Sequence, residues 1–188
     1  MTILFLDLET DGVISPKGDF TNQKIIQISY QIHKNNADQI IKINDFVKGV
    51  DFIKDFEGMN RVSVDFLNEN GIELKDALEK LVNYINIYNV DKIVCHNTAF
   101  DLTIINRELS KLNIFIKKDI EEICTQKNEK ICKFCNLPNL KWPKLLELAE
   151  KLDIIIDKDK LHDASYDVEI LQHCFTKLVE KDVLNFNL

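Results

Sequence analysis

Two acidic residues near the N-terminus have types and spacing that could support chemistry. Asp7 and Glu9 stand two positions apart at the end of the apolar run ILFL. In a β-strand such side chains leave the same face, with Cα atoms about 6.6 Å apart. Carboxylates at the end of a buried strand are costly unless they are paired or bind a metal. A divalent cation would relieve their repulsion, whereas a helix cap or a salt bridge at the strand end is the alternative interpretation.

A second acidic position lies in IVCHNTAFD, residues 93–101. A short strand is expected to end at His96 and Asn97, and a helix to begin near Ala99. Asp101 then falls in the first turn of that helix, where the helix dipole favours a negative charge. By itself the position also fits an ordinary first-turn aspartate without a chemical role.

The third segment is LHDASYDVEIL, residues 161–171, which places His162 before a helix and Asp167 inside it. Histidine is the side chain best suited to accepting a proton from water near neutral pH. A loop histidine can reach back toward a carboxylate in the first turns of the following helix. A surface loop residue and a solvated helix position are the alternatives for these two residues.

Taken together, the order and context of these residues resemble the DnaQ-like, or DEDDh, family of 3′→5′ exonucleases, which share the ribonuclease-H-like fold. The positions that match are Asp7, Glu9, Thr10 and Gly12 for the first family motif, His96, Asn97, Phe100 and Asp101 for the second, and His162 and Asp167 for the third. IIQIS at 25–29 and KWPKLLEL at 141–148 also match family segments. The resemblance extends over about residues 3–178.

This resemblance implies a metal-dependent hydrolase that releases nucleoside 5′-monophosphates one at a time from the 3′ end of DNA. Two divalent cations, Mg²⁺ or Mn²⁺, would bind at carboxylates, which suit these ions as ligands. Asp7 would bridge both cations, and Glu9 and Asp167 would complete the first. Asp101 would serve the second cation, largely through water. His162 would be the general base that activates the attacking water.

The resemblance also implies contacts to the last nucleotides of the substrate. Thr10 would hold the 3′-hydroxyl, and Val13 would pack on the terminal base in place of the leucine common in the family. Asn97 and Phe100 would lie near the last nucleotides, where stacking contributes about 1–3 kcal/mol per base. For Phe100, a place in the hydrophobic core is an equal alternative.

The elements that must position these residues follow from hydrophobic spacing. Strands are expected at 3–7, 25–32, 40–47, 92–95 and 120–124, and helices at 63–71, 74–88, from about 99, from Pro143 in a first turn, and at 164–179. The first three strands predict an antiparallel meander and the later ones alternate with helices. The fold class is therefore α/β, a ribonuclease-H-like mixed sheet of three meander strands plus parallel strands, flanked by helices. We expect one exonuclease domain over residues 1–180 and a short tail over 181–188.

The composition excludes some classes of protein. Of the 188 residues, 45% are hydrophobic and 29% charged, as in ordinary globular domains. No apolar stretch is long enough to cross a membrane. The net charge of −7 argues against binding nucleic acid through bulk positive potential, but leaves nucleic acid open as a substrate. An odd number of cysteines and the lack of an export signal predict a reducing, cytoplasmic location.

Cysteines and lysines gather between the predicted strand at 120–124 and the helix from Pro143. Cys132 and Cys135 form a Cys-x-x-Cys pair with Cys124 upstream, but no fourth zinc ligand is evident, so thiols on a loop are favoured over zinc. The lysines of this region are Lys127, Lys130, Lys133, Lys141 and Lys144. They could meet a phosphate backbone or form a solvated loop face.

Alternative functions remain open. Within the family, the substrate could be RNA or short oligoribonucleotides, because the catalytic residues do not report contacts to the 2′-hydroxyl. Outside it, the chain could be a non-catalytic nucleic-acid-binding module. We expect a partner nucleic acid with a free 3′ end, single-stranded DNA in the leading hypothesis, and no membrane. A polymerase or repair protein would have to be a separate partner.

Overall fold

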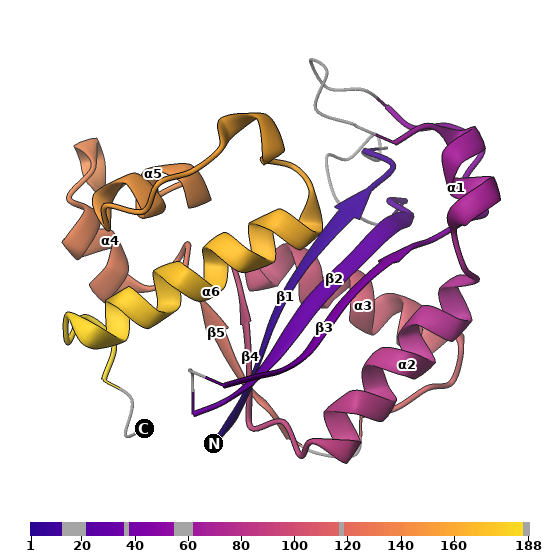
Figure 1. Cartoon of the computed structure of the whole chain (residues 1–188), viewed down its shortest axis with the longest axis horizontal. Helices are drawn as coiled ribbons and strands as arrows, with labels where there is room; N and C mark the ends of the chain where they lie inside the picture. The colour runs from indigo at the N-terminus through magenta and orange to yellow at the C-terminus, as the bar shows by residue number, and fades with distance from the viewer. Residues whose placement is uncertain (13–21, 36–37, 55–61, 117–118, 186–188) are drawn as a thin grey trace.

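The computed structural model describes residues 1–12, 22–35, 38–54, 62–116 and 119–185. Its centre is a five-stranded sheet in the order β3-β2-β1-β4-β5 (Figure 1). The strands are β1 (Thr2–Thr10), β2 (Ile25–Lys34), β3 (Asp38–Phe46), β4 (Lys92–Cys95) and β5 (Glu121–Cys124). β1 to β3 pair antiparallel, whereas β4 pairs parallel with both β1 and β5. The expected mixed sheet with an antiparallel meander is therefore confirmed.

Helices cover both faces of the sheet. They are α1 (Val64–Asn70), α2 (Leu74–Ile87), α3 (Thr98–Lys111), α4 (Glu129–Cys135), α5 (Leu145–Lys151) and α6 (Ala164–Glu180), with short 3-10 helices at Pro138–Leu140 and Lys158–Lys160. The side chains of α2 and α3 pack on one face, and those of α4, α5 and α6 on the other (Figure 1). None of the described helices has the length and hydrophobicity that crossing a bilayer requires.

The two apolar faces of β1 explain its central place in the sheet. Leu4 and Leu6 belong to the hydrophobic core beneath α2 and α3, whereas Ile3 and Phe5 belong to the core beneath α6. Successive side chains of a strand point to opposite faces, so an apolar run of this kind fits only a strand covered on both sides. The same alternation carries Asp7 to the α6 face.

Local signals set the start and end of α1 as expected. The Ser63 hydroxyl accepts a hydrogen bond from the Phe66 backbone N–H at 3.1 Å, as an N-cap residue does. At the other end, a Cβ on Gly71 would lie 2.5 Å from the Leu67 carbonyl oxygen and 2.8 Å from the Lys48 backbone nitrogen. Only glycine therefore fits where the chain turns from α1 back toward the end of β3.

Two local expectations were wrong. Cys132 and Cys135 lie on α4 rather than on a loop, because Asn128 caps a helix there by accepting from the backbone N–H groups of Lys130 and Ile131. Pro143 does not lie in the first turn of a helix. It precedes α5, whose N-cap residue is Lys144.

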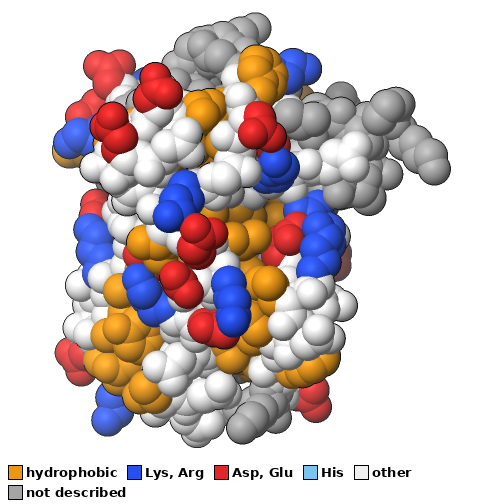
Figure 2. All heavy atoms as spheres, turned by 90° about the vertical axis from the view of Figure 1, so that its right-hand side faces the viewer, with side chains coloured by type: hydrophobic (Ala, Val, Ile, Leu, Met, Phe, Trp, Pro, Cys, Tyr) orange, Lys and Arg blue, Asp and Glu red, His pale blue; other side chains and the backbone are white. Residues whose placement is uncertain are grey.

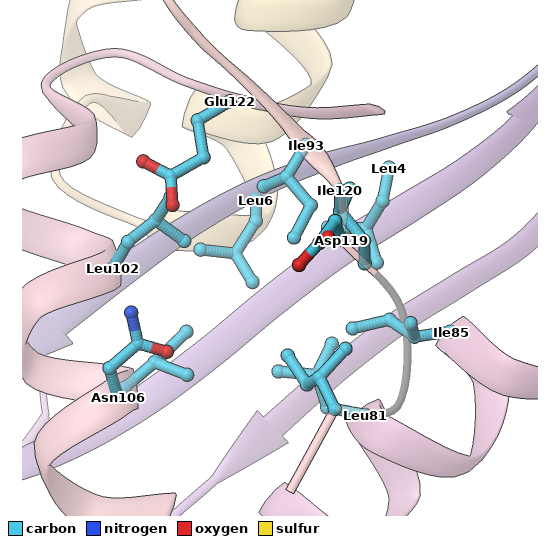
Figure 3. A pocket seen from close by; sticks show the side chains of 12 residues that line it. Leu4, Leu6, Leu81, Ile85, Ile93, Leu102, Asn106, Asp119, Ile120 and Glu122 are labelled. Atoms are coloured by element: carbon cyan, nitrogen blue, oxygen red, sulfur yellow. The ribbon is translucent and has the colours of Figure 1, made fainter. Parts of the chain in front are cut away.

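A pocket of about 260 Å³ lies between the sheet and helices α2 and α3. Its walls are aliphatic, with Leu4 and Leu6 from β1 and Leu81 from α2, and Figure 3 shows Asp119 and Glu122 as the acidic side chains among them. Below we call it the apolar pocket. On the outer surface to the side of α1 and α2, acidic and basic side chains alternate with hydrophobic ones (Figure 2).

Candidate active site

A second pocket, of about 420 Å³, opens where β1 and β4 end, and we call it the acidic pocket. β1 and β4 run parallel, so their carboxyl ends meet at the same edge of the sheet. Many of the residues expected from the sequence line this pocket, and they come from three elements and one loop. These residues are Asp7 and Glu9 from β1, Asn97, Phe100 and Asp101 from the start of α3, Asp167 from the first turn of α6, and His162 from the loop before it.

The carboxyl groups of this pocket lie in surroundings that disfavour their charge. Burial raises the pKa of Asp7 well above its ordinary value, and the charges of Asp101, Glu9 and Asp167 add to the effect. Burial, followed by the charges of Asp167 and Asp101, raises the pKa of Glu9 to about 8. Burial also raises the pKa of Asp101 to about 8, although backbone hydrogen bonds oppose that shift. Mutual repulsion of this kind is relieved when a cation binds between the carboxylates.

The donor set fits divalent cations. The ligand atoms of Glu9, His162 and Asp167 all lie within 4.8 Å of one another. The Asp101 Oδ1 atom is buried and accepts no hydrogen bond from any described residue. A buried carboxylate oxygen without a partner is costly and is expected to have a ligand in the working protein. Carboxylate oxygens are the ligands that Mg²⁺ and Mn²⁺ prefer.

His162, which lines this pocket, has a strained backbone conformation. Its φ of 66° lies in the left-handed region, which residues other than glycine seldom adopt. Its backbone N–H donates to Asp167 Oδ2 at 3.2 Å, which joins the loop to the first turn of α6. Strain of this kind tends to occur at functional sites.

Asn97 is also held in the left-handed region, with φ 105° and ψ 62°, where it caps α3. Its side chain makes no capping hydrogen bond, and its Oδ1 atom is buried without a hydrogen-bond partner among the described residues. This amide is therefore available to a ligand in the pocket. Phe100 lines the pocket and also packs against the hydrophobic core. A place in the core and a place beside a bound nucleotide are therefore compatible for this residue.

His96 connects the end of β4 to the opposite wall of the pocket. Its Nε2 atom donates to the Pro143 carbonyl oxygen at 3.0 Å, so Nδ1 is left to accept from the Thr125 hydroxyl at 2.9 Å. Burial lowers the pKa of His96 to about 4, which keeps the imidazole neutral near pH 7. We assign His96 a positioning role, which its place in the motif did not reveal.

Gln27 and Asp163 were also missed, although they hold α6 against the sheet. Asp163 caps α6 by accepting from the Ser165 backbone N–H at 2.8 Å, and it accepts from Gln27 Nε2 at 3.2 Å. Gln27 lies opposite Glu9 in the β1–β2 register, so this contact places the start of α6 beside Glu9. The N-cap rule could have found Asp163, whereas no local pattern marks Gln27.

The remaining expected substrate contacts are placed differently. The Thr10 hydroxyl is buried, donates to Gln23 Oε1 at 3.2 Å and does not belong to the described pocket lining. Val13 lies outside the described residues. Gln126, Lys144 and other residues of the 125–146 region form the wall that sequence reasoning did not assign to the site.

The sequence is similar to that of known nucleases and polymerases. The model of the RNase_T family, described as Exonuclease, matches residues 4–175. The DNA polymerase III PolC-type of Mycoplasmopsis pulmonis is 29% identical over 175 residues, which make up 90% of this chain and 11% of that protein. The DNA polymerase III subunit epsilon of Buchnera aphidicola subsp. Schizaphis graminum is 28% identical over 151 residues, 80% of this chain and 56% of that protein. The chain thus spans only part of the length of these relatives.

Solved structures share the fold at lower sequence identity. E. coli exonuclease I in complex with a dT13 oligonucleotide superposes with a TM-score of 0.72 at 17% identity, over 95% of this chain and 41% of that one. The nuclease domain of 3′hExo, described as a DEDDh family member bound to rAMP, gives a TM-score of 0.69 at 13% identity, over 100% and 96% of the two chains. These likenesses establish the same ribonuclease-H-like architecture.

Proposed function

Because the chain belongs to the DnaQ-like (DEDDh) exonuclease family, we propose that it hydrolyses phosphodiester bonds from the 3′ end of DNA with the help of two divalent cations. The observation that carries the proposal is the convergence of Asp7, Glu9, Asp101, His162 and Asp167 on one pocket. These residues come from β1, from α3, and from α6 with the loop before it. We further propose that residues 1–180 form one exonuclease domain and that 181–188 are a tail.

Each residue of the pocket would have a distinct task. Two divalent cations, when bound, would lower the pKa of water and neutralise the charge of the phosphate. Asp7 would hold both ions, with Glu9 and Asp167 completing the first site and Asp101 serving the second. Burial raises the pKa values of Asp7, Glu9 and Asp101, and neighbouring acidic charges raise those of Asp7 and Glu9 further, so a bound cation would stabilise the ionised carboxylates.

The proton and bond changes balance around His162. An imidazole nitrogen would take a proton from the attacking water, whose oxygen then bonds to phosphorus. The bond between phosphorus and the 3′-oxygen of the preceding nucleotide breaks, this oxygen takes up a proton from solvent, and the terminal nucleotide leaves as a nucleoside 5′-monophosphate. The Asn97 amide would orient the last nucleotide, and Phe100 would contact its base.

DNA is the favoured substrate because the relatives point to it. Two relatives are named as DNA polymerase III proteins, and the exonuclease I structure contains a dT13 oligonucleotide. One observation supports RNA as a second candidate, since the nuclease domain of 3′hExo was solved with rAMP bound. A polymerase is proposed as a partner on the strength of the same relatives.

The test uses purified protein with Mn²⁺ and matched single-stranded DNA and RNA labelled at the 5′ end, each with a free or a blocked 3′ end. We expect a ladder that shortens from the free 3′ end, with DNA degraded faster than RNA and no ladder from blocked substrates. Faster degradation of RNA would support the exoribonuclease alternative. Binding without degradation of either substrate would contradict the proposal and favour a non-catalytic module.

A further inference from the structure

The region between β5 and α5, residues 125–144, differs in charge from the rest of the chain. It contains five lysines and one glutamate, a net charge of +4 in a protein whose total is −7. We call it the basic segment. Two of its lysines are neutralised, since Lys133 pairs with Glu129 and Lys141 with Glu147. Lys127, Lys130 and Lys144 form no ion pair with the described residues.

Several lysines elsewhere on the fold are paired with acids. On the side of α2, Lys48 pairs with Glu73, and Lys80 pairs with Asp45. Figure 2 shows the result on that side, where acidic and basic side chains lie next to one another. Lys127, Lys130 and Lys144 therefore contrast with Lys48 and Lys80, whose charges are balanced by neighbouring acids.

The basic segment directly adjoins the acidic pocket. His96 binds it near both ends, through the Thr125 hydroxyl and the Pro143 carbonyl. Gln126 and Lys144 line the pocket itself. A strand that reaches the carboxylates with its 3′ end would therefore pass beside this segment.

Trp142 is the aromatic group that this surface presents. It is 55% exposed, and it lies two residues before Lys144, which lines the acidic pocket. The Lys127 Nζ atom lies 4.8 Å from the centre of the indole ring. An exposed tryptophan beside unpaired lysines combines the two features by which proteins bind single strands, a ring for stacking and cations for phosphates.

We propose that Trp142, Lys127 and Lys144 form a second subsite, which binds nucleotides on the 5′ side of the terminal one. A base stacks on Trp142, and Lys127 and Lys144 contact backbone phosphates. This subsite rests on the proposed function for the direction of the strand, because the 3′ end must lie in the acidic pocket. Its role is to position long substrates, so it adds affinity for a strand and not for a single nucleotide.

The chain offers a direct probe, because Trp142 is its one tryptophan. Protein in EDTA is titrated with single-stranded DNA while tryptophan emission and its quenching by acrylamide are followed. We expect oligonucleotides to quench the emission and to protect the ring from acrylamide, and a mononucleotide to do neither. Unchanged emission at saturating oligonucleotide, with binding verified by anisotropy of a labelled strand, would overturn the proposal.

Variants separate stacking from charge. Trp142→Ala is expected to weaken binding of a labelled oligonucleotide by about 5- to 100-fold, and Trp142→Phe to restore most of it. Phe115→Ala, at another exposed aromatic residue, is the matched control and should bind as the wild type does. Lys127→Gln and Lys144→Gln should each lower the salt slope of binding by about 0.7, whereas Lys75→Gln on α2 should not.

Activity gives an independent criterion. For the wild type and for Trp142→Ala, kcat/KM is measured on a long oligonucleotide and on a dinucleotide. The value for the long oligonucleotide is divided by the value for the dinucleotide, and the two proteins are compared by this ratio. A fall in the ratio supports the subsite, whereas an equal loss on both substrates would assign Trp142 to the pocket and overturn it. The quenching titration needs no turnover, so failure of hydrolysis in the wild type would contradict the proposed function while the subsite is still tested.

Discussion

The acidic pocket and the apolar pocket are built from the same strand and both contain carboxylates, but they place them differently. Asp7 and Glu9 leave β1 on the α6 face, among further acids from α3 and α6. Leu4 and Leu6 leave it on the other face and line the apolar pocket, whose acids are Asp119 and Glu122 (Figure 3).

The carboxylates of the two pockets differ in their burial and in the charges near them, not in residue type. Asp101 is 1% exposed and its pKa is raised by burial, whereas Asp119 and Glu122 are exposed to water. Buried, mutually repelling carboxylates can be stabilised by cations, and solvated ones gain little from them. We therefore expect changes in the acidic pocket to alter rate, and changes in the apolar pocket to alter stability.

The largest effect is expected from Asp7→Asn. Loss of a ligand to both cations removes several kcal/mol of transition-state stabilisation, so kcat should fall by about 1,000-fold or more. Glu122→Gln, which removes the same charge beside the apolar pocket, should leave the rate within about twofold. Both are measured by initial rates on labelled DNA, and an active Asp7→Asn protein would remove Asp7 from the mechanism.

His162→Ala comes next. Loss of a general base should lower kcat by about 100- to 10,000-fold with little change in KM. His173→Ala is the control, because this histidine is exposed on α6 outside the pocket. Single-turnover rates across a pH series give the test, and a His162→Ala profile that matches the wild type would assign the base elsewhere.

A change in the apolar pocket should have the opposite signature. Leu81→Ala enlarges an existing cavity and should lower the free energy of unfolding by about 2–5 kcal/mol, with a small effect on kcat per folded molecule. Ile87→Ala, at a residue of the same helix that is 61% exposed, should change stability by less than about 0.5 kcal/mol. Urea unfolding measures both, and equal losses would mean that the apolar pocket contributes no packing energy.

The smallest effect concerns the metal-free protein. Glu9 and Asp101 have ordinary pKa values of about 4 in the unfolded state, and these values are raised to about 8 in the folded state. Between these two pH values the folded state binds protons that the unfolded state has already released. Stability from these groups is present at low pH and is lost as the pH rises toward about 8. The melting temperature of Asp101→Asn in EDTA should therefore gain a few degrees on the wild type between about pH 6 and pH 8. If the difference in melting temperature between Asp101→Asn and the wild type were constant across this range, the raised pKa of Asp101 would be contradicted.

Much of the fold followed from the sequence because its signals are local. Alternation along β1 placed Asp7 and Glu9 on one face, and the start of α6 put Asp167 in its first turn. α4 was missed because a seven-residue helix shows little periodicity, and its cap at Asn128 was the available clue. Lys144 was considered as a phosphate contact, but the sequence did not place it in the pocket, because only tertiary contacts, such as that between His96 and Pro143, bring this region there.

The two-cation site is tested most directly by the anomalous scattering of Mn²⁺ in crystals of the protein soaked with this ion. We expect two peaks about 3.5–4 Å apart among Asp7, Glu9, Asp101 and Asp167, and none beside Asp119 and Glu122. An acidic pocket without a peak at saturating Mn²⁺, in a protein that degrades DNA in EDTA, would contradict it.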